Sequence, residues 1–553
     1  MTSKAAAKAT ELPVSGPGET KHVIFKFVAR RTLRSATFAA LVFGLFAAAK
    51  IIGYADVYPT AKERSAAGAL LAGNAGFTAI FGSPYHLETV AGYAVWYALG
   101  VGVLLGGIWA YLVATKTFRG EETAGRWEPL LMGQTTLARA TAAALAGLGV
   151  SVGLFFAVAA VILVAIGRAK GVNITAGPAL YLALASVAAA ALFMAVGAFT
   201  SQVMPTRARA AGLATAIFGI CFLLRAAGDI TSAHWLTDIS PLGWVEKLHP
   251  LLSPQPLWLV PIVAFIIALS AATVYLAGHR DLGASLIHDS DEARPRTFLL
   301  RGPLTGAIRL TRASSVAWVA AFAVFAVFFG TLTNTAAQAF ESSASALHMI
   351  DRLAGVARES GAKAFLGITF LIIILLLMSY AATAVGAIRQ DEANGYTDNL
   401  LVQPVSRSRL LWGRIGLIVA VILVSGFVSC VVVWLTLGRH TNGLSFNDLW
   451  LAGVNSLPPA ILTLGAGVFA LGVIPRYTTI VAYAVVAWSF LVQMVSSGLN
   501  LNHWVLDTSV FYHVALAPAA SPKWGSDLVI TVIGLGLCVV GAAAFNRRDM
   551  AGE

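Results

Sequence analysis

The chain has 553 residues, of which 58% are hydrophobic and only 12% charged, and its mean hydropathy is +0.77. Soluble domains carry about 25% charged residues, so this composition excludes an ordinary soluble protein and indicates a membrane protein. The net charge of +12 does not point to nucleic acid, because the Lys and Arg residues cluster beside apolar stretches. That placement is typical of proteins that orient their membrane helices by charge.

Apolar stretches long enough to cross a hydrocarbon core of about 30 Å recur along the whole chain. They predict twelve membrane-spanning helices, near 33–53, 92–114, 138–166, 177–203, 211–228, 257–278, 313–334, 364–388, 411–437, 455–474, 478–499 and 526–545. The first 21 residues are polar and lack the apolar core of a signal peptide, so no cleavage is expected. Cys221, Cys430 and Cys538 lie within spans without metal-ligand spacing and are interpreted as small packed side chains.

The basic residues also predict an orientation. If the N-terminus is cytoplasmic, 26 of the 38 Lys and Arg residues fall in the inside segments or the adjoining span ends. This bias predicts a multi-pass protein of the cell (inner or plasma) membrane with both termini cytoplasmic. We predict a first six-helix unit at 1–280, a cytoplasmic linker at 281–312 and a second six-helix unit at 313–553.

The two halves share a repeat at an offset of 268 to 270 residues. In the loops after the second and eighth spans, Arg119, Glu122, Gly125, Leu130 and Leu131 match Arg389, Glu392, Gly395, Leu400 and Leu401, while Glu121 and Glu128 match Asp391 and Asp398. The same offset relates Arg280-Asp281 to Arg548-Asp549. Because each repeat has six spans, an even number, the halves should run parallel and be related by a pseudo-two-fold axis along the membrane normal.

The second of these loops continues as Gln403-Pro404-Val405-Ser406-Arg407. It resembles the ABC-2 type permeases, whose six-helix (type V exporter-like) units carry an acidic, Gly-containing stretch that ends in Leu-Leu-x-x-Pro-Val-x-Arg. The first loop departs from this pattern, with Gln134-Thr135-Thr136 in place of Pro-Val-Ser. The fused double unit is similar, over nearly the whole chain, to permeases of actinobacterial polyketide-antibiotic (tetronasin-type) and multidrug exporters.

The resemblance implies an all-α, twelve-helix permease of an ATP-binding cassette exporter, bound to two copies of a separate ATPase subunit. It implies multidrug efflux, and hence antibiotic resistance, by outward transport of hydrophobic or amphipathic compounds. In the family these loops form coupling helices that dock into the ATPase, which assigns that role to Arg119, Glu121, Glu122, Gly125, Glu128, Arg389, Asp391, Glu392, Gly395 and Asp398. A solvated loop that merely caps the next helix is the alternative. We expect Glu122 and Glu392 to be surface groups.

Two further features follow from the resemblance. The basic stretches that precede the first span of each half correspond to an elbow helix at the inner interface, although a plain topology anchor explains them equally well. The fifth helix of each unit is expected near the central seam. That position implies a substrate path past Phe218, Phe222, Trp488, Phe490 and Met494, against the alternative that these aromatic side chains face lipid or pack.

No Gly-Lys dipeptide occurs, so the phosphate-binding loop of nucleotide hydrolases is absent and the chain is expected to be no enzyme by itself. We expect it to bind no cofactor or metal, with ATP and Mg²⁺ on the partner subunit, and to contact membrane lipids. One alternative is a proton-coupled secondary drug transporter of the major facilitator kind. The middles of the spans lack ionisable residues, which disfavours it, and Arg225 is interpreted as an interface residue. A membrane enzyme or a lipid or glycolipid exporter is a further alternative.

Overall fold

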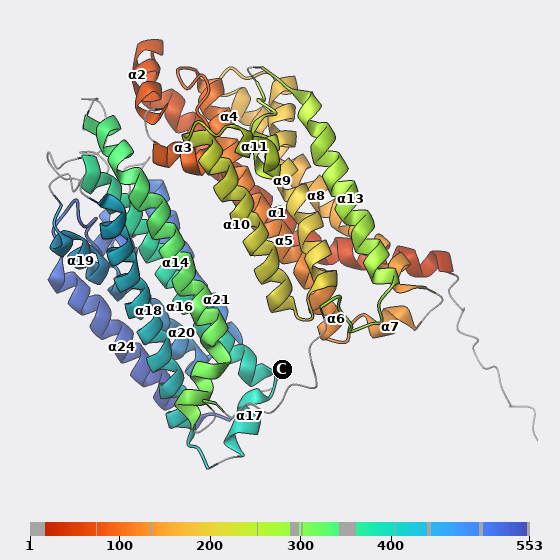
Figure 1. The fold of residues 1–553 in the computed structure, drawn as a ribbon, viewed down its shortest axis with the longest axis vertical. Helices are drawn as coiled ribbons and strands as arrows, with labels where there is room; N and C mark the ends of the chain where they lie inside the picture. The colour runs from red at the N-terminus through yellow and green to blue at the C-terminus, as the bar shows by residue number, and fades with distance from the viewer. Residues whose placement is uncertain are drawn as a thin grey trace, which may run out of the picture. The chain divides into compact units, whose positions relative to one another are not determined.

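The computed structural model describes residues 17–72, 75–132, 135–251, 253–287, 298–299, 302–341, 361–402, 404–438, 444–496 and 502–549 (Figure 1). Within these ranges every regular element is a helix, and eleven helical segments are long and apolar enough to cross a membrane. The prediction of an all-α polytopic membrane protein is therefore confirmed. Contacts divide the chain into two compact units, Met1–Ala72 with Phe77–Ala293, and Gly73–Gly76 with Arg294–Glu553.

Unit 1 contains six candidate spans, each of which coincides with one predicted from the sequence. The second span is a run of short helical pieces, Val90–Thr123, that includes two π-helical turns. Its elements are α1 (Pro17–Val57), α2 (Ala61–Ala72), α3 (Ala75–Phe81), α4 (Val90–Val101), η1 (Gly102–Gly106), α5 (Gly107–Thr115), η2 (Lys116–Gly120), α6 (Glu121–Thr123), α7 (Glu128–Leu131), α8 (Leu137–Gly167), α9 (Ala176–Val203), α10 (Arg207–Ile230), α11 (Trp235–Ile239), α12 (Pro241–Glu246), η3 (Pro256–Trp258) and α13 (Leu259–Gly278).

Unit 2 contains the other five candidate spans. The twelfth span, expected at 478–499, is not among them, and a helix of 19 residues, α21, lies at that position. The span expected at 455–474 begins earlier, at Phe446, and is interrupted at Ser456 ahead of Pro458 and Pro459. The elements are α14 (Pro303–Glu341), α16 (Gly361–Ala393), α17 (Tyr396–Leu401), α18 (Arg407–Leu437), α19 (Phe446–Asn455), α20 (Leu457–Val473), η4 (Pro475–Tyr477), α21 (Thr478–Ser496), α22 (His503–Leu506), α23 (Val510–His513) and α24 (Trp524–Arg547).

The sequence repeat is also a repeat of helix packing. In unit 1, α1 packs on α8, and α9 packs on α5, α10 and α13. In unit 2, α14 packs on α18, and α20 packs on α16, α21 and α24. The fourth span is the most enclosed of each unit. In its apolar stretch of 18 residues, 78% of the residues are buried in α9 and 72% in the α19–α20 span. Each unit is thus built around its fourth span.

Small residues allow this close packing in unit 2. Gly465 and Gly472 of α20 face Gly534 and Gly541 of α24, and a Cβ on Gly465 would lie 2.1 Å from the Gly534 carbonyl oxygen. Glycine is needed here because the two backbones touch, as in many membrane helix pairs. Cys221, Cys430 and Cys538 are free and buried, which confirms their interpretation as packed side chains.

The basic stretches ahead of the first span of each unit form no separate helices. They are the first turns of α1 and α14, which continue without a break into the spans. Ile24 and Val28 of the α1 stretch are buried, so this part of the helix packs against its own unit. Gln134 and Gln403, which mark the difference between the two acidic loops, lie outside the described residues.

Candidate functional site: the acidic loop after the second span of each unit

A left-handed glycine breaks the helix at the same place in both acidic loops. Gly125 has a φ of 69° and Gly395 a φ of 73°, a conformation that only glycine adopts without strain. The N–H of each glycine donates to the carbonyl oxygen three residues earlier, Glu122 or Glu392, at 3.0 Å. The chain then re-enters a short helix, α7 or α17, so both loops hold the short helices that the resemblance implies.

The end of each loop is also built in the same way. Thr136 in unit 1 and Ser406 in unit 2 accept a hydrogen bond from the backbone N–H of Arg139 and Arg409, each at 3.3 Å. A hydroxyl at this position satisfies one of the free N–H groups at a helix start. The next span, α8 or α18, therefore begins at an equivalent residue, even though the first loop lacks the Pro-Val-Ser sequence of the second.

The first ion cluster consists of Arg119, Glu122 and Arg280. The two carboxylate oxygens of Glu122 accept from the Arg280 guanidinium at 2.6 and 2.8 Å, and Arg119 lies 3.2 Å away. Glu122 also accepts from the backbone N–H of Gly283 at 2.8 Å. Arg119 is fully buried and donates to the carbonyl oxygen of Ser201 at 2.9 Å. The cluster ties the end of the second span to the segment that follows the sixth.

The second ion cluster, Arg389, Glu392 and Arg548, repeats this arrangement in unit 2. Arg548 donates to both Glu392 oxygens at 2.6 and 2.7 Å, while Arg389 lies 3.5 Å from the carboxylate. Glu122 is 9% exposed and Glu392 is 3% exposed. The expectation that these two acids are surface groups is therefore wrong, because the matching arginine near the end of each unit folds back over them.

The remaining acids of the loops divide into buried and exposed groups. Glu121 is buried between Arg31, at 2.8 Å, and Arg126, at 2.5 Å. Asp391 pairs with Arg414 of α18. Glu128 and Asp398 are exposed at equivalent positions of α7 and α17, so these two carboxylates are the ones that an approaching protein would meet.

Exposed apolar side chains accompany the two exposed acids. Met132 and Val402, which are also repeat equivalents, are each 84% exposed, while Trp127 and Thr397 on the opposite side of the short helices are buried. Figure 1 shows α7 near one end of the helices of unit 1, and α17 near one end of those of unit 2. Each loop thus presents a small apolar and acidic surface at the end of its unit. We call these surfaces the unit 1 face (Glu128, Met132) and the unit 2 face (Asp398, Val402).

The residues assigned to a substrate path have different surroundings. Phe218 is buried against Phe193, with ring centroids 4.8 Å apart, and Phe222 lies under the guanidinium of Arg225, 4.9 Å from its ring. In unit 2, Trp488 is half-exposed and its Nε1 donates to Thr508 at 2.8 Å. Phe490 packs on a hydrophobic cluster of unit 2, and the side chain of Met494 lies outside the described residues. Phe218 is thus a packing residue in this conformation, whereas its repeat equivalent Trp488 is accessible.

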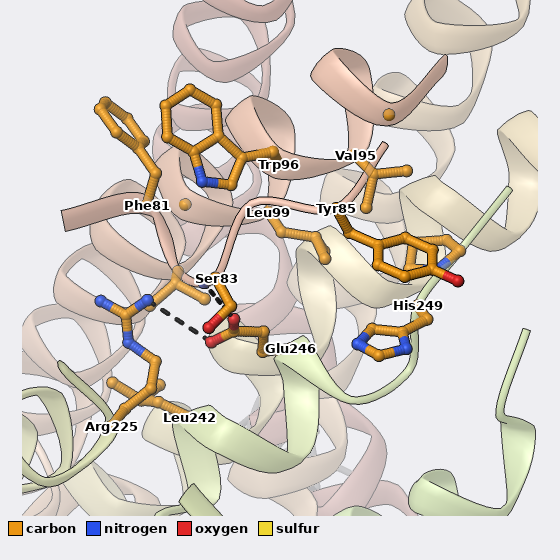
Figure 2. Close-up of a pocket in the computed structure, with 14 residues that line it drawn as sticks. Phe81, Ser83, Tyr85, Val95, Trp96, Leu99, Arg225, Leu242, Glu246 and His249 are labelled. Atoms are coloured by element: carbon orange, nitrogen blue, oxygen red, sulfur yellow. Dashed lines mark hydrogen bonds and ion pairs between the residues drawn. The ribbon is translucent and has the colours of Figure 1, made fainter. Parts of the chain in front are cut away.

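Sequence reasoning missed a buried polar group in unit 1, shown in Figure 2. Arg225 is 3% exposed and donates to the carbonyl oxygen of Ala79 at 2.6 Å. Its guanidinium also lies 3.6 Å from both Asp229 and Glu246. Arg225 lies near the end of α10, and the end of α3 covers its guanidinium within unit 1. The spacing of Arg225 and Asp229, one helical turn apart in an apolar span, is the signal that could have found this group.

Aromatic rings line the small pocket beside Arg225 (Figure 2). Trp96 donates to the carbonyl oxygen of Gly82 at 2.8 Å, and Tyr85 stacks on His249 at 5.3 Å. Burial lowers the pKa of His249, so its ring stacks in the neutral form. The cavity of about 30 Å³ has room for little more than a water molecule. The pocket is therefore a polar packing centre in this conformation; Figure 1 shows α3 and α11 at the end of unit 1 opposite α6 and α7.

Two helical units that share packing, loops and ion clusters define a polytopic membrane protein of the duplicated permease class. A family described as "Multidrug efflux system permease Rv1217c, C-terminal domain" matches residues 64–280 and 300–546, so the chain belongs to this family of multidrug efflux permeases. The chain is also similar to the "Multidrug efflux system permease protein Rv1217c" of Mycobacterium tuberculosis (strain ATCC 25618 / H37Rv). The two are 26% identical over 499 residues, which cover 89% of this chain and 88% of the relative. The predicted resemblance to multidrug exporter permeases is confirmed.

Proposed function

We propose that this chain is the membrane-spanning permease of an ATP-driven multidrug exporter whose ATP is hydrolysed by a separate subunit. Family membership supports the transport role, and the sequence has no phosphate-binding loop of its own. Two copies of the ATPase subunit dock, one on the unit 1 face and one on the unit 2 face. The substrate is a hydrophobic or amphipathic compound that moves outward across the membrane.

The observation that carries this proposal is the exposure of the same apolar and acidic surface on both loops. Exposure of a large apolar side chain to water is unfavourable, yet Met132 and Val402 are each 84% exposed, each beside a carboxylate. A solvated connector does not explain why both loops share this feature. Such a surface suits a partner that covers the apolar group and pairs with the acid. The buried ion clusters hold each loop on its own unit, so that a push on α7 or α17 moves the second and sixth spans together.

Charge reversal at the exposed acids tests the docking. The permease would be co-purified with its ATPase subunit as wild type and as Glu128→Lys and Asp398→Lys, with Glu63→Lys on the exposed α2 as the matched control. Close charge pairs across interfaces are worth about 1.5 to 7 kcal/mol, so each reversal at a loop should reduce recovered ATPase by tenfold or more. Normal assembly and drug-stimulated hydrolysis in both loop variants would show that the loops are solvated connectors.

A proton-coupled carrier is the second candidate, and the buried group of Arg225, Asp229 and Glu246 is the observation that favours it. Ionisable groups enclosed in a membrane protein often lie on proton pathways. Inverted vesicles that contain the permease and its ATPase subunit separate the two mechanisms. We expect drug uptake that needs ATP, survives a protonophore and persists in Asp229→Asn. Uptake without the ATPase subunit that collapses with a protonophore would replace ATP-driven transport by proton coupling.

A further inference from the structure

The sixth span of unit 2 begins with a buried carboxylate that has no partner among the described residues. Asp527 lies in the first turn of α24 and is 4% exposed. Both of its carboxylate oxygens are buried, and neither accepts a hydrogen bond from a residue that the structure describes. One turn further along, Ile530 belongs to an apolar cluster of unit 2. An isolated charge in such surroundings is strongly unfavourable, so Asp527 needs either a cation or a proton.

A helix cap is an alternative role for Asp527, because the free N–H groups at the start of a helix stabilise an anion. Its side chain does not use them, since both oxygens are without a donor in the described part of the chain. The backbone N–H of Asp527 donates instead to the carbonyl oxygen of Lys523 at 3.0 Å. The side chain of Lys523 is exposed, and no described ion pair joins it to Asp527. The described contacts therefore assign Asp527 neither to a cap nor to an ion pair.

The packing of α24 on α20 shows which residues face this acid. A Cβ on Gly534 of α24 would lie 2.8 Å from the carbonyl oxygen of Ile461 on α20. Seven residues further along both helices, Gly541 meets Val468 in the same way. A seven-residue step keeps the same faces of two packed helices in contact. The two helices therefore run parallel, in a register that can be followed towards their first turns.

The same seven-residue step, taken backwards, places Asp527 beside Val454, where the fourth span is interrupted. Two consecutive prolines in the first turn of α20 have no N–H. The carbonyl oxygens of Val454 and Asn455 therefore lack the partner that an unbroken helix would give them. Ser456 keeps nearly helical angles, with φ at −82° and ψ at −13°, so the span continues through the break and the register is kept.

The side chain of Asn455 supplies a further free acceptor at the break. Asn455 is 1% exposed, and its Nδ2 donates to the carbonyl oxygen of Ala515 at 2.9 Å. That bond fixes the orientation of the amide and leaves Oδ1 buried without a donor in the described part of the chain. Asp527 and the break thus contribute oxygen acceptors and no donor. A proton on Asp527 turns one acceptor into a donor, so that a single hydrogen bond satisfies two oxygens.

Unit 1 lacks every part of this arrangement. The repeat offsets of 270 and 268 residues put Ala185 in place of Asn455 and Leu259 in place of Asp527. Alanines replace the two prolines, and α9 runs through this position without a break. The broken span, the buried amide and the buried acid are present together in unit 2 and absent together from unit 1. This joint occurrence indicates that they act as one group.

We propose that Asp527 holds a proton and donates it in a hydrogen bond to an oxygen at the break, either a backbone carbonyl of Val454 or Asn455 or the Asn455 amide. The acid is then neutral, and the bond joins the start of the sixth span to the fourth, around which unit 2 is built. Figure 1 shows α19 at the end of unit 2 opposite α17, so this proton site is separate from the acidic loop. It is also separate from the group of Arg225, which belongs to unit 1. The proposal holds whether or not an ATPase docks on the loops.

Infrared spectroscopy of the purified full chain tests the site, because the carbonyl stretch of a neutral carboxylic acid is separate from the bands of carboxylates and amides. Spectra would be recorded at neutral pH for wild type and Asp527→Asn. Asp507→Asn, which changes an exposed acid of the same unit, is the matched control. An ordinary aspartate, with a pKa of about 3.9, is protonated in only about one molecule in a thousand at neutral pH. We expect Asp527→Asn to lose one neutral-acid band per chain and Asp507→Asn to lose none.

Three more variants test the acceptor, because the position of the band depends on the hydrogen bond that the acid donates. We expect the band to shift in Asn455→Ala, which removes Oδ1, or in Pro458→Ala or Pro459→Ala, which return an N–H to the helix. An unchanged band in all three would overturn the assigned hydrogen bond. Loss of carboxylate bands alone in Asp527→Asn would overturn the bound proton. Failure of Asp527→Asn to fold, while Asp507→Asn folds, would also overturn it, because an amide can replace a neutral acid as a donor but cannot replace a carboxylate.

Discussion

At the scale of single residues, the buried acids and the exposed acids of the loops have different tasks. Glu122 binds Arg280, 158 residues further along the chain, and Glu392 binds Arg548, 156 residues further along, and these pairs hold each loop on its unit. Glu128 and Asp398 contribute nothing to this anchoring and are exposed. A charge change at the first pair therefore reports on folding, and only a change at the second pair reports on a partner.

The first prediction concerns Glu122→Lys and Glu392→Lys. Each substitution puts a lysine against two arginines and leaves buried cations without a carboxylate, a loss of about 3 to 5 kcal/mol in the free energy of unfolding. We expect a clear fall in the midpoint of thermal unfolding and in the yield from membranes. Glu128→Lys and Asp398→Lys, as exposed controls, should change stability by about 0.5 kcal/mol at most.

A charge swap separates the ion pair from the general cost of a buried lysine. In Glu122→Arg combined with Arg280→Glu, the pair is re-formed with its charges exchanged, so part of the lost stability should return. If Glu122→Lys is as stable as wild type, the acid is not enclosed by Arg119 and Arg280. In that case its earlier interpretation as a docking residue would be restored.

At the scale of helices, the sequence predicts which helices exist far better than it predicts the residues at which they begin and end. Apolar length located the spans, because a membrane helix must bury its backbone in a continuous apolar stretch. Apolar length placed the start of the first span near residue 33, whereas α1 starts at Pro17. The turns before residue 33 are basic, but they are helical too because one of their faces is buried. Apolar length also missed the start of α19 at Phe446, which a capping box of Ser445 and Asp448 fixes locally.

The loops illustrate the same limit. The positions of the glycines and the acids were recognised from the repeat, whereas the left-handed turn at each glycine was not predicted. Which acids are buried depends on Arg280 and Arg548, and a partner more than 150 residues away is known only from the fold. The recurrence of Arg280-Asp281 as Arg548-Asp549 was visible in the sequence, but nothing local indicated what these arginines bind.

The second prediction tests the packing of α20 on α24. A Cβ on Gly541 would lie 2.4 Å from the carbonyl oxygen of Val468, so Gly541→Leu must push the two helices apart. Overpacking of this kind costs about 1 to 3 kcal/mol. We expect a lower unfolding midpoint and an aggregated fraction in size-exclusion chromatography. Gly536→Leu on the same helix has open space at its Cβ and should behave like wild type. Equal behaviour of the two variants would contradict the close contact.

At the scale of the whole chain, the same anchored loop occurs once in each unit. An even number of spans between the two loops would return the chain to the same side of the membrane. Both loops would then face one compartment, as the paired docking of two identical ATPase subunits requires. The described loops are alike in backbone, capping and ion cluster, so two copies of one subunit would meet equivalent surfaces. The sidedness of the loops is therefore the property of the whole chain on which the proposed mechanism depends most directly.

The last prediction is the orientation itself. Because 26 of the 38 Lys and Arg residues lie in the segments assigned to the inside, both termini and both acidic loops should be cytoplasmic. A reporter active only in the cytoplasm should work when fused after residue 553 or inserted at 288–296, and should fail at position 341. A reporter active only outside should give the opposite pattern at the same three positions, which controls for expression. Cytoplasmic activity at 341 together with silence at 553 would invert the topology. Both loops would then lie on the side without ATP, and docking of an ATPase on α7 and α17 would be impossible.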